Sequence, residues 1–180
     1  MIYFTADLHL GHEEVIAKRH RPFASVTEMN EALIRNYNQR VGENDTVYIL
    51  GDLCHRLAAE DADALIARLN GRKILLRGNH DLDYDPALFE GVHDFLMEDF
   101  DGRRFVMIHY ALIDWPGRKK GGIHLHGHMH ESRAYNEENR ARGLFRYDVG
   151  VDANDYRPIS IEEILAFYEG FAWTTETGLR

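Results

Sequence analysis

The chain has 180 residues and a formal net charge of −9, with 44% hydrophobic and 28% charged residues. These proportions are typical of a globular protein and exclude a disordered or membrane-embedded chain. The negative balance argues against tight, sequence-independent binding of long nucleic acid, because that affinity comes mostly from Lys and Arg that neutralise phosphates.

The length predicts one domain over residues 1–180, large enough that no metal is needed merely to hold it folded. The single cysteine, Cys54, excludes an internal disulfide and fits a reducing compartment. The first ten residues, MIYFTADLHL, contain neither a basic leader nor a long apolar core. We therefore expect no signal peptide, no membrane span and a cytoplasmic location.

The amino-terminal half alternates short apolar runs with amphipathic segments. Residues 2–6 form the first apolar run, and residues 29–41 have the apolar spacing of one helix face. A second run at 47–50 and a second helical pattern at 62–69 follow, and then a third run at 74–76. The runs predict strands that are covered on both faces, as in a sheet between other layers.

The carboxy-terminal half continues with a fourth apolar run at 105–108. Segments 123–126 and 145–151 alternate apolar and polar residues, which predicts strands with one polar face. Residues 161–168 have helical spacing. The order of elements predicts a layered α/β protein.

Two of the predicted helices begin with a capping-box pattern, Ser25 with Glu28 and Ser160 with Glu163. In this pattern the hydroxyl and the carboxylate satisfy backbone amides that have no partner inside the helix. Both helix starts are therefore well defined by the sequence.

Polar side chains that can bind metals follow five of the predicted strands. They are Asp7 and His9, Asp52, Asn79 with His80 and Asp81, His109, and His128 with His130. Each motif alone is weak, since GD is often a turn and a lone histidine is more often a core residue. Ligands in open α/β sheets collect at the carboxyl ends of strands, so five such ends together favour one common site.

The ordered motifs DLH (7–9), GD (51–52), GNHD (78–81), His109 and GHMH (127–130) resemble the signature of the calcineurin-like metallophosphoesterases. The tail over 147–164 also resembles the closing strand and helix of small bacterial members. The resemblance implies an α/β fold in four layers, with two mixed β-sheets packed as a sandwich and flanked by helices. It also implies a two-metal site at one edge.

The resemblance assigns the ligands of both ions. Asp7, His9, Asp52 and His130 would hold one ion, Asp52, Asn79, His109 and His128 the other, and Asp52 would bridge them. Two divalent cations against two carboxylates leave a charge of about +2, which suits an anionic phosphoester. Mixed carboxylate, amide and imidazole donors favour Mn²⁺, Fe²⁺, Ni²⁺ or Zn²⁺ over Ca²⁺, without selecting one.

The catalytic roles follow from the same resemblance. A hydroxide that bridges the metals would attack phosphorus, His80 would protonate the leaving oxygen, and Asp81 would orient His80. The alternative for Asp81 is a helix or turn cap. The motif GDLCHR (51–56) departs from the VDR of the phosphoprotein phosphatases, and GNHD departs from their GNHE, which argues against a protein phosphatase.

Two further residues are candidates for substrate binding. His12 could contact substrate, although a histidine that caps the following helix is the simpler interpretation. Arg56 could bind phosphate, or form a surface ion pair. His124 and His126 are expected to be strand side chains, and Gly127 to release the chain so that His128 and His130 reach different metals.

The loop after His109 offers Tyr110 and Trp115 as stacking surfaces and three basic residues at 118–120, a combination compatible with a nucleotide. An anchored surface loop is the alternative. The polar segment 131–143 could be a mobile rim or lid, or be disordered.

The function that these observations favour is a metal-dependent phosphoesterase acting on a small phosphodiester or nucleotide-type ester, with no membrane partner. One alternative is a nuclease acting on RNA or DNA, which predicts a basic track beside the metals. The other is a non-catalytic protein-binding scaffold of the same fold. A scaffold would be expected to lose ligands or the acid, whereas all seven ligand positions and His80 are present.

Overall fold

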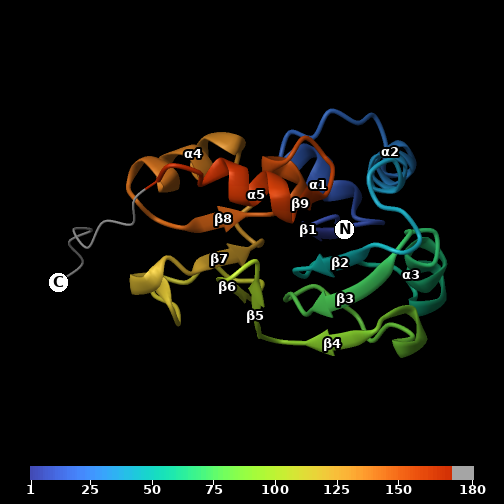
Figure 1. Ribbon diagram of the computed structural model, residues 1–180. Coiled ribbons are helices and arrows are strands. Elements are labelled where there is room, and N and C mark those ends of the chain that lie inside the picture. Colours follow the sequence, from blue (N-terminus) through green and yellow to red (C-terminus); the bar gives the residue numbers. More distant parts are fainter. Residues whose placement is uncertain (172–180) are drawn as a thin grey trace.

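The computed structural model describes residues 1–171, and two β-sheets form its centre (Figure 1). The larger sheet has the order β4-β3-β2-β1-β9. Its strands are β1 (Ile2–Thr5), β2 (Thr46–Ile49), β3 (Arg72–Leu76), β4 (Gly91–His93) and β9 (Ile159–Ser160). The first four are parallel and β9 is antiparallel to β1, so the sheet is mixed.

The smaller sheet has the order β5-β6-β7-β8. Its strands are β5 (Leu96–Phe100), β6 (Arg103–Met107), β7 (Ile123–His126) and β8 (Arg146–Asp148). β5 is antiparallel to β6, whereas the other pairs are parallel. The expected pair of mixed sheets is therefore confirmed.

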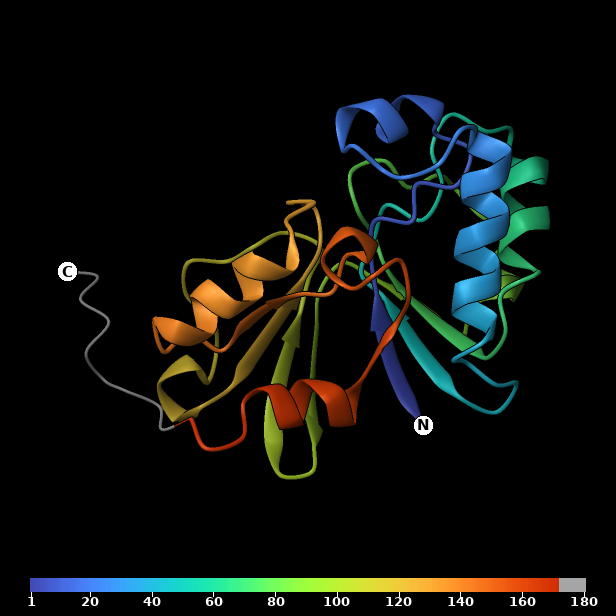
Figure 2. The ribbon, with the colours of Figure 1, turned by 90° about the horizontal axis from the view of Figure 1, so that it is seen from above.

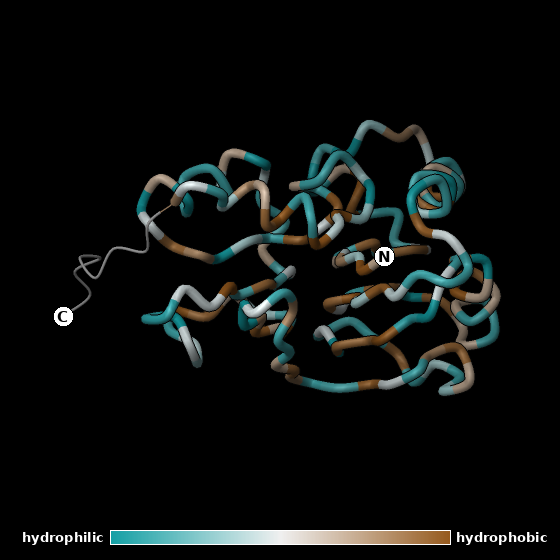
Figure 3. The backbone as a smooth tube through the Cα atoms, viewed as in Figure 1, coloured by the Kyte–Doolittle hydropathy of each residue, from teal (hydrophilic) through white to brown (hydrophobic). Residues whose placement is uncertain are grey.

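The apolar runs of the two sheets pack against each other in one buried cluster. Phe4 of β1 stacks on Phe105 of β6 with ring centroids 6.0 Å apart and planes 5° apart. Hydrophobic residues accordingly concentrate along the strands in Figure 3. Burial of these runs on both faces explains why they contain almost no polar residue.

Helices flank both sheets (Figure 2). The helices α2 (Val26–Asn38) and α3 (Ala59–Ile66) cover the outer face of the larger sheet and share a second buried cluster with it. α4 (Arg133–Ala141) packs on β8, and α5 (Ile161–Phe167) buries Ile164 in the cluster between the sheets. The remaining elements are α1 (Glu13–Lys18) and the 3-10 turns η1 (Pro86–Leu88), η2 (Arg118–Lys120) and η3 (Val151–Ala153).

No helix within residues 1–171 is both long and apolar enough to cross a membrane. The expectation of a single domain over 1–180 stays a prediction, and its last nine residues, 172–180, lie outside the described part.

One of the two predicted capping boxes is complete. The Ser160 hydroxyl accepts the Glu163 amide at 3.2 Å, and the Glu163 carboxylate accepts the Ser160 amide at 2.8 Å. Ser25 likewise accepts the Glu28 amide at 3.2 Å. The Glu28 carboxylate, however, accepts the amide of Ala24, one residue before the cap, so this box is only half formed.

The prediction of a polar face on strand 123–126 is wrong, because all four residues of β7 are buried. His124 accepts the Leu112 amide at 3.0 Å through Nε2 and lies 3.1 Å from the Val106 carbonyl through Nδ1. Burial lowers the pKa of His124 to about 4, so its ring is neutral near pH 7. Paired hydrogen bonds thus let a polar side chain occupy an interior position.

The polar segment 131–143 forms a helix instead of an irregular loop. Asn136 of α4 is buried and uses both ends of its amide on Asp148 of β8. It accepts the Asp148 amide at 2.7 Å and donates to the Asp148 carbonyl at 3.0 Å. Polar contacts therefore fix the helix to the sheet. For this reason its sequence has no apolar stripe.

Candidate metal centre

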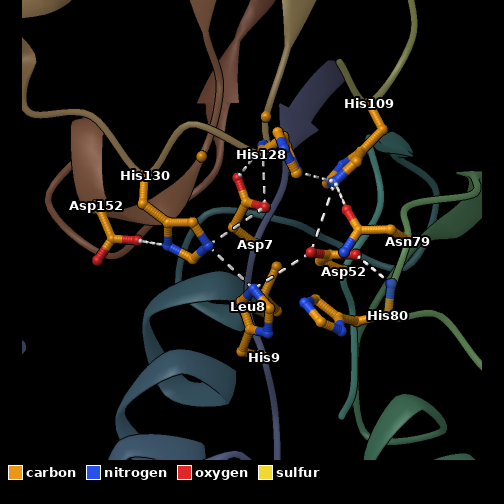
Figure 4. A network of polar contacts seen from close by, with 12 residues as sticks. Asp7, Leu8, His9, Asp52, Asn79, His80, His109, His128, His130 and Asp152 are labelled. Carbon is orange, nitrogen blue, oxygen red and sulfur yellow. Dashed lines mark hydrogen bonds and ion pairs between the residues drawn. The ribbon is translucent and has the colours of Figure 1, made fainter. Parts of the chain in front are cut away.

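The loops that follow five strands bring their polar side chains to one place (Figure 4). Asp7 and His9 follow β1, Asp52 follows β2, and Asn79 follows β3. His109 follows β6, and His128 and His130 follow β7. The centre thus lies where the carboxyl ends of strands from both sheets meet, as the general rule for α/β sheets predicts.

The first group of potential ligands consists of Asp7, His9 and His130, whose ligand atoms all lie within 4.8 Å of one another. The Nε2 atoms of His9 and His130 are 3.1 Å apart. His130 Nε2 is 3.9 Å from Asp7 Oδ1. This group can hold one metal ion.

The second group consists of Asp52, His109 and His128, again with ligand atoms within 4.8 Å of one another. His109 Nε2 lies 3.2 Å from His128 Nδ1 and 3.2 Å from the amide oxygen of Asn79. Asn79 therefore adds an oxygen donor to this group, which can hold another ion.

Asp52 connects the two groups through one oxygen atom. Its Oδ2 lies 3.4 Å from His9 Nε2 and 3.5 Å from His109 Nε2. The carboxylate is thus within reach of both groups. The structure brings all seven predicted ligands together, and their assignment as ligands stays a prediction.

The hydrogen bonds of His109 are compatible with its predicted role as a metal ligand. His109 Nδ1 lies 2.7 Å from the Leu50 carbonyl, which fixes the proton on that nitrogen. Its Nε2 lone pair then faces only Asn79 oxygen, Asp52 oxygen and another imidazole nitrogen. A cation between these atoms would satisfy them together, and a neutral imidazole with its other nitrogen hydrogen-bonded is the usual metal ligand.

The electrostatics agree with this fit. Burial raises the pKa of Asp7, and the negative charges of Asp148, Asp52 and Asp152 raise it further. Burial, followed by the neighbouring His130, lowers the pKa of His9 to about 2, so this imidazole is neutral. A cation among these carboxylates would remove the repulsion that Asp7 experiences.

Five of the predicted ligands have left-handed backbone conformations: φ is 57° at Asp7, 51° at His9, 53° at Asp52, 70° at His128 and 51° at His130. Such conformations are costly for residues other than glycine, and they cluster at functional sites. His128 and His130 themselves turn the chain after β7, and the release of the chain at Gly127 stays a prediction. Glycine is needed at 127 because a Cβ there would lie 2.6 Å from Asp7 Oδ2.

Comparison with known proteins shows the family of the chain. The family model for calcineurin-like phosphoesterases matches residues 1–148. The chain belongs to the calcineurin-like phosphoesterase family. It is therefore a phosphoric ester hydrolase of a metal-dependent family, and its two Asp/His groups are candidate metal-binding positions.

Two relatives extend this similarity over nearly the whole chain. An uncharacterized protein of Methanocaldococcus jannaschii is 33% identical over 171 residues, which cover 93% of this chain and 91% of the relative. The crystal structure of a protein of unknown function from Aquifex aeolicus has a TM-score of 0.73 and 28% identity, and the match covers 92% of this chain and 98% of that chain. Neither relative indicates a substrate.

The phosphoesterase places His80 beside the centre. Its backbone amide donates to Asp52 Oδ1 at 2.9 Å, and its ring centroid is 5.5 Å from that of His9. The ring of His55, which the sequence did not single out, lies next to that of His80, with ring centroids 4.2 Å apart. His80 is only partly buried and can therefore approach a substrate.

Asp81 supports the loops of the centre. Its carboxylate accepts the amides of Asp52, Leu53 and Gly78 at 2.7 to 2.9 Å and the Tyr84 hydroxyl at 2.8 Å. No hydrogen bond joins Asp81 to His80 within the described residues. This geometry corresponds to the turn-capping alternative for Asp81.

His12 stands at the N-cap of α1, but its side chain makes no capping hydrogen bond. Its Nδ1 lies 3.3 Å from Nδ1 of His9, so it faces the back of a predicted ligand. Arg56 is exposed and forms an ion pair with Glu14, which corresponds to its surface ion-pair alternative. The contacts of these two side chains thus do not indicate phosphate binding.

The loop after β6 separates the two predicted stacking residues. Trp115 is buried, and its indole donates to the Gly122 carbonyl at 2.9 Å, so it anchors the loop. Tyr110 is 44% exposed, and its ring centroid is 4.8 Å from that of His128. Only Tyr110 of this pair can meet a substrate at the centre.

Sequence reasoning missed the polar residues behind the predicted ligands: Arg21, His55, Asp148 and Asp152. All but His55 are connected to Asp7 or His130 by hydrogen bonds or charge. Burial raises the pKa of Asp148 to about 7. Asp148 and Asp152 lie in segment 147–164, which the resemblance covered without assigning roles, whereas no such signal pointed to Arg21 or His55.

Proposed function

We propose that this phosphoesterase holds two divalent ions and hydrolyses a small phosphodiester or a nucleotide-type phosphoester. The observation that carries the proposal is the position of Asp52 Oδ2, which is 3.4 Å from a histidine of one group and 3.5 Å from a histidine of the other. A shared carboxylate between two ligand groups is the usual arrangement of a two-metal hydrolase.

In this proposal the first ion is held by Asp7, His9, Asp52 and His130, and the second by Asp52, Asn79, His109 and His128. Bound ions would supply an activated water and neutralise charge on the phosphate. The donor set of carboxylate, amide oxygen and imidazole suits Mn²⁺, Fe²⁺, Ni²⁺ or Zn²⁺.

His80 is the proposed general acid. It follows Asn79 directly, and its amide is tied to Asp52 at 2.9 Å, so its ring is held beside the reacting phosphate. A proton donor must lie within hydrogen-bonding reach of the leaving oxygen. Asp81 acts on this step indirectly, by holding the loops that carry Asp52 and Asn79.

The organic part of the ester is proposed to lie against Tyr110. This ring is exposed beside His128, and an aromatic surface next to a phosphate site suits a nucleobase or another planar group. The net charge of −9 speaks against the alternative of a nuclease on long RNA or DNA. A cytoplasmic location is part of the proposal, supported by the single, buried Cys54.

The test is a screen of the metal-reconstituted protein against aryl monoesters, aryl diesters and cyclic nucleotides, with chelated protein as the control. Hydrolysis of diesters or nucleotides that depends on added metal is the expected result. Cleavage of nucleic acid that falls steeply with salt would favour the nuclease. The absence of turnover with every metal and ester would favour the protein-binding scaffold.

A further inference from the structure

An arginine and an aspartate outside every motif form a buried ion pair behind the centre. Arg21 lies in the loop between α1 and α2, and Asp152 lies in η3. The guanidinium donates to both carboxylate oxygens, from Nε to Oδ1 at 2.9 Å and from Nη2 to Oδ2 at 2.8 Å. The Arg21 side chain is completely buried, and Asp152 lies beyond residue 148, where the match to the family ends.

This pair touches both segments that carry the first ligand group. Asp152 Oδ2 accepts a hydrogen bond from Nδ1 of His130 at 2.8 Å (Figure 4). Arg21 donates to the main-chain carbonyls of Asp7 at 2.7 Å and Leu8 at 3.0 Å. It therefore holds the left-handed turn between Asp7 and His9, while Asp152 holds the ring of His130.

The second ligand group is supported in another way. His109 is oriented by the main-chain carbonyl of Leu50 at 2.7 Å, and Asp52 accepts the amide of His80 at 2.9 Å. Within residues 1–171, the hydrogen bonds of Arg21 and Asp152 reach no ligand of this second group. The ion pair thus makes its direct contacts with the first group, whereas the second group is held by main-chain partners and by the Asp81 carboxylate, which accepts the Asp52 amide at 2.9 Å.

We propose that Arg21 and Asp152 are positioning residues that set the affinity of one ion position, the one formed by Asp7, His9 and His130. A carboxylate behind an imidazole fixes its tautomer and strengthens it as a ligand. The guanidinium keeps that carboxylate from being an uncompensated buried charge and holds the other two ligands in register. The inference rests on the two-ion centre proposed above.

The test is a calorimetric titration of chelator-treated protein with Mn²⁺, compared between the unsubstituted protein and Asp152→Asn. The unsubstituted protein should bind two ions. Asp152→Asn should retain one binding event unchanged and weaken the other by about 10- to 100-fold. Arg21→Lys, which keeps the charge but loses the two-pronged contact, should weaken the same event to a smaller extent.

Arg40→Gln is the matched control. Arg40 also forms an ion pair, with Glu163, but this pair does not contact the predicted ligands. Thermal unfolding of each metal-free variant separates misfolding from loss of an ion, and Arg21→Lys replaces Asp152→Asn if the latter does not fold. If a folded variant weakens both Mn²⁺ binding events equally, or neither of them, the positioning role is wrong but the two-ion centre is not affected. Fewer than two ions on the unsubstituted protein would overturn the two-ion centre itself.

Discussion

Each histidine that uses Nε2 at the centre has its Nδ1 directed to a protein atom. The partners are the Leu50 carbonyl for His109, the Asp152 carboxylate for His130 and the His12 ring for His9. The carbonyl and the carboxylate only accept hydrogen bonds, so the free nitrogen of His109 and of His130 is defined before any ion binds. Such preorganisation reduces the ordering that metal binding requires.

His80→Ala is expected to fold and to keep its metals but to lose turnover. Because the imidazole would donate a proton to the leaving oxygen, the loss should be about 10²- to 10⁴-fold for alkyl esters and smaller for aryl esters, whose leaving groups need no proton. Steady-state rates with a matched pair of alkyl and aryl diesters measure the difference. His93→Ala, at an exposed site on β4, is the control, and equal rates for His80→Ala and the parent on the alkyl ester would remove His80 from the mechanism.

Asp52→Asn is expected to lower metal occupancy, because the amide removes a negative charge that both ions would share. Elemental analysis of the purified, reconstituted protein measures the metal content per chain. Asp99→Asn, which breaks a surface ion pair with Arg104, should keep full occupancy. Full occupancy of Asp52→Asn would contradict the bridging role.

At the scale of residues, the sequence predicted which polar residues meet at the centre, because each lies in a segment that follows a predicted strand. Their assignment as ligands came from the resemblance to the family and stays a prediction. Arg21 and Asp152 could not be predicted in this way, since they are 131 residues apart and meet only through the fold. The sequence could not decide whether Trp115 is a stacking surface or a loop anchor, because its exposure depends on the course of its loop, which has no local pattern.

At the scale of elements, α4 shows how a polar sequence can form a packed helix. Its buried residues are the asparagines Asn136 and Asn139. The side-chain amide of Asn136 hydrogen-bonds both the amide and the carbonyl of Asp148, as the main chain of a neighbouring strand would. The helix places Tyr135, whose hydroxyl lies 3.3 Å from Nε2 of His126. α4 thus partly covers the buried His126 of β7.

Asn136→Ala is expected to lower the free energy of unfolding by about 1 to 3 kcal/mol, because the amide and carbonyl of Asp148 lose buried partners. Urea denaturation of the chelated protein measures this loss. Asn38→Ala is the comparison, since Asn38 also makes two main-chain contacts, with Arg68 and Asn70, at a more exposed place. A cost no larger than that of Asn38→Ala would mean that α4 is not fixed to β8 by Asn136.

The elements that the sequence predicted well are those with a local cause. Apolar runs gave β1, β2, β3 and β6, and Ser160 marks the start of α5. No apolar run in the sequence marks β4 and β5, whose residues are exposed or half-buried. α4 was missed because its buried face is polar.

At the scale of the whole molecule, the two sheets place a set of neutral histidines in the interior, and this makes stability depend on pH. His124 is fully buried, and burial lowers its pKa from 6.5 to about 4. Between these two values the unfolded chain binds a proton that the folded chain does not bind. The free energy of unfolding therefore falls as the pH falls from 6.5 to about 4.

His124→Gln is expected to reduce this pH dependence by up to about 3 kcal/mol, since glutamine does not titrate but can keep both hydrogen bonds. Urea denaturation of chelated protein at several pH values between 7 and 4 measures both slopes. The slope for His124→Gln should be shallower even if its stability at pH 7 is lower. Parallel slopes for the two proteins would show that His124 is not held neutral by the fold.

The most direct test of the two-ion centre is a crystal structure of the Mn²⁺-reconstituted protein, with the ions located by anomalous scattering. We expect two peaks about 3.5 to 4 Å apart with the Asp52 carboxylate between them. One peak should contact Asp7, His9 and His130, and the other Asn79, His109 and His128. A single peak, or peaks that do not contact these residues, would contradict the central claim.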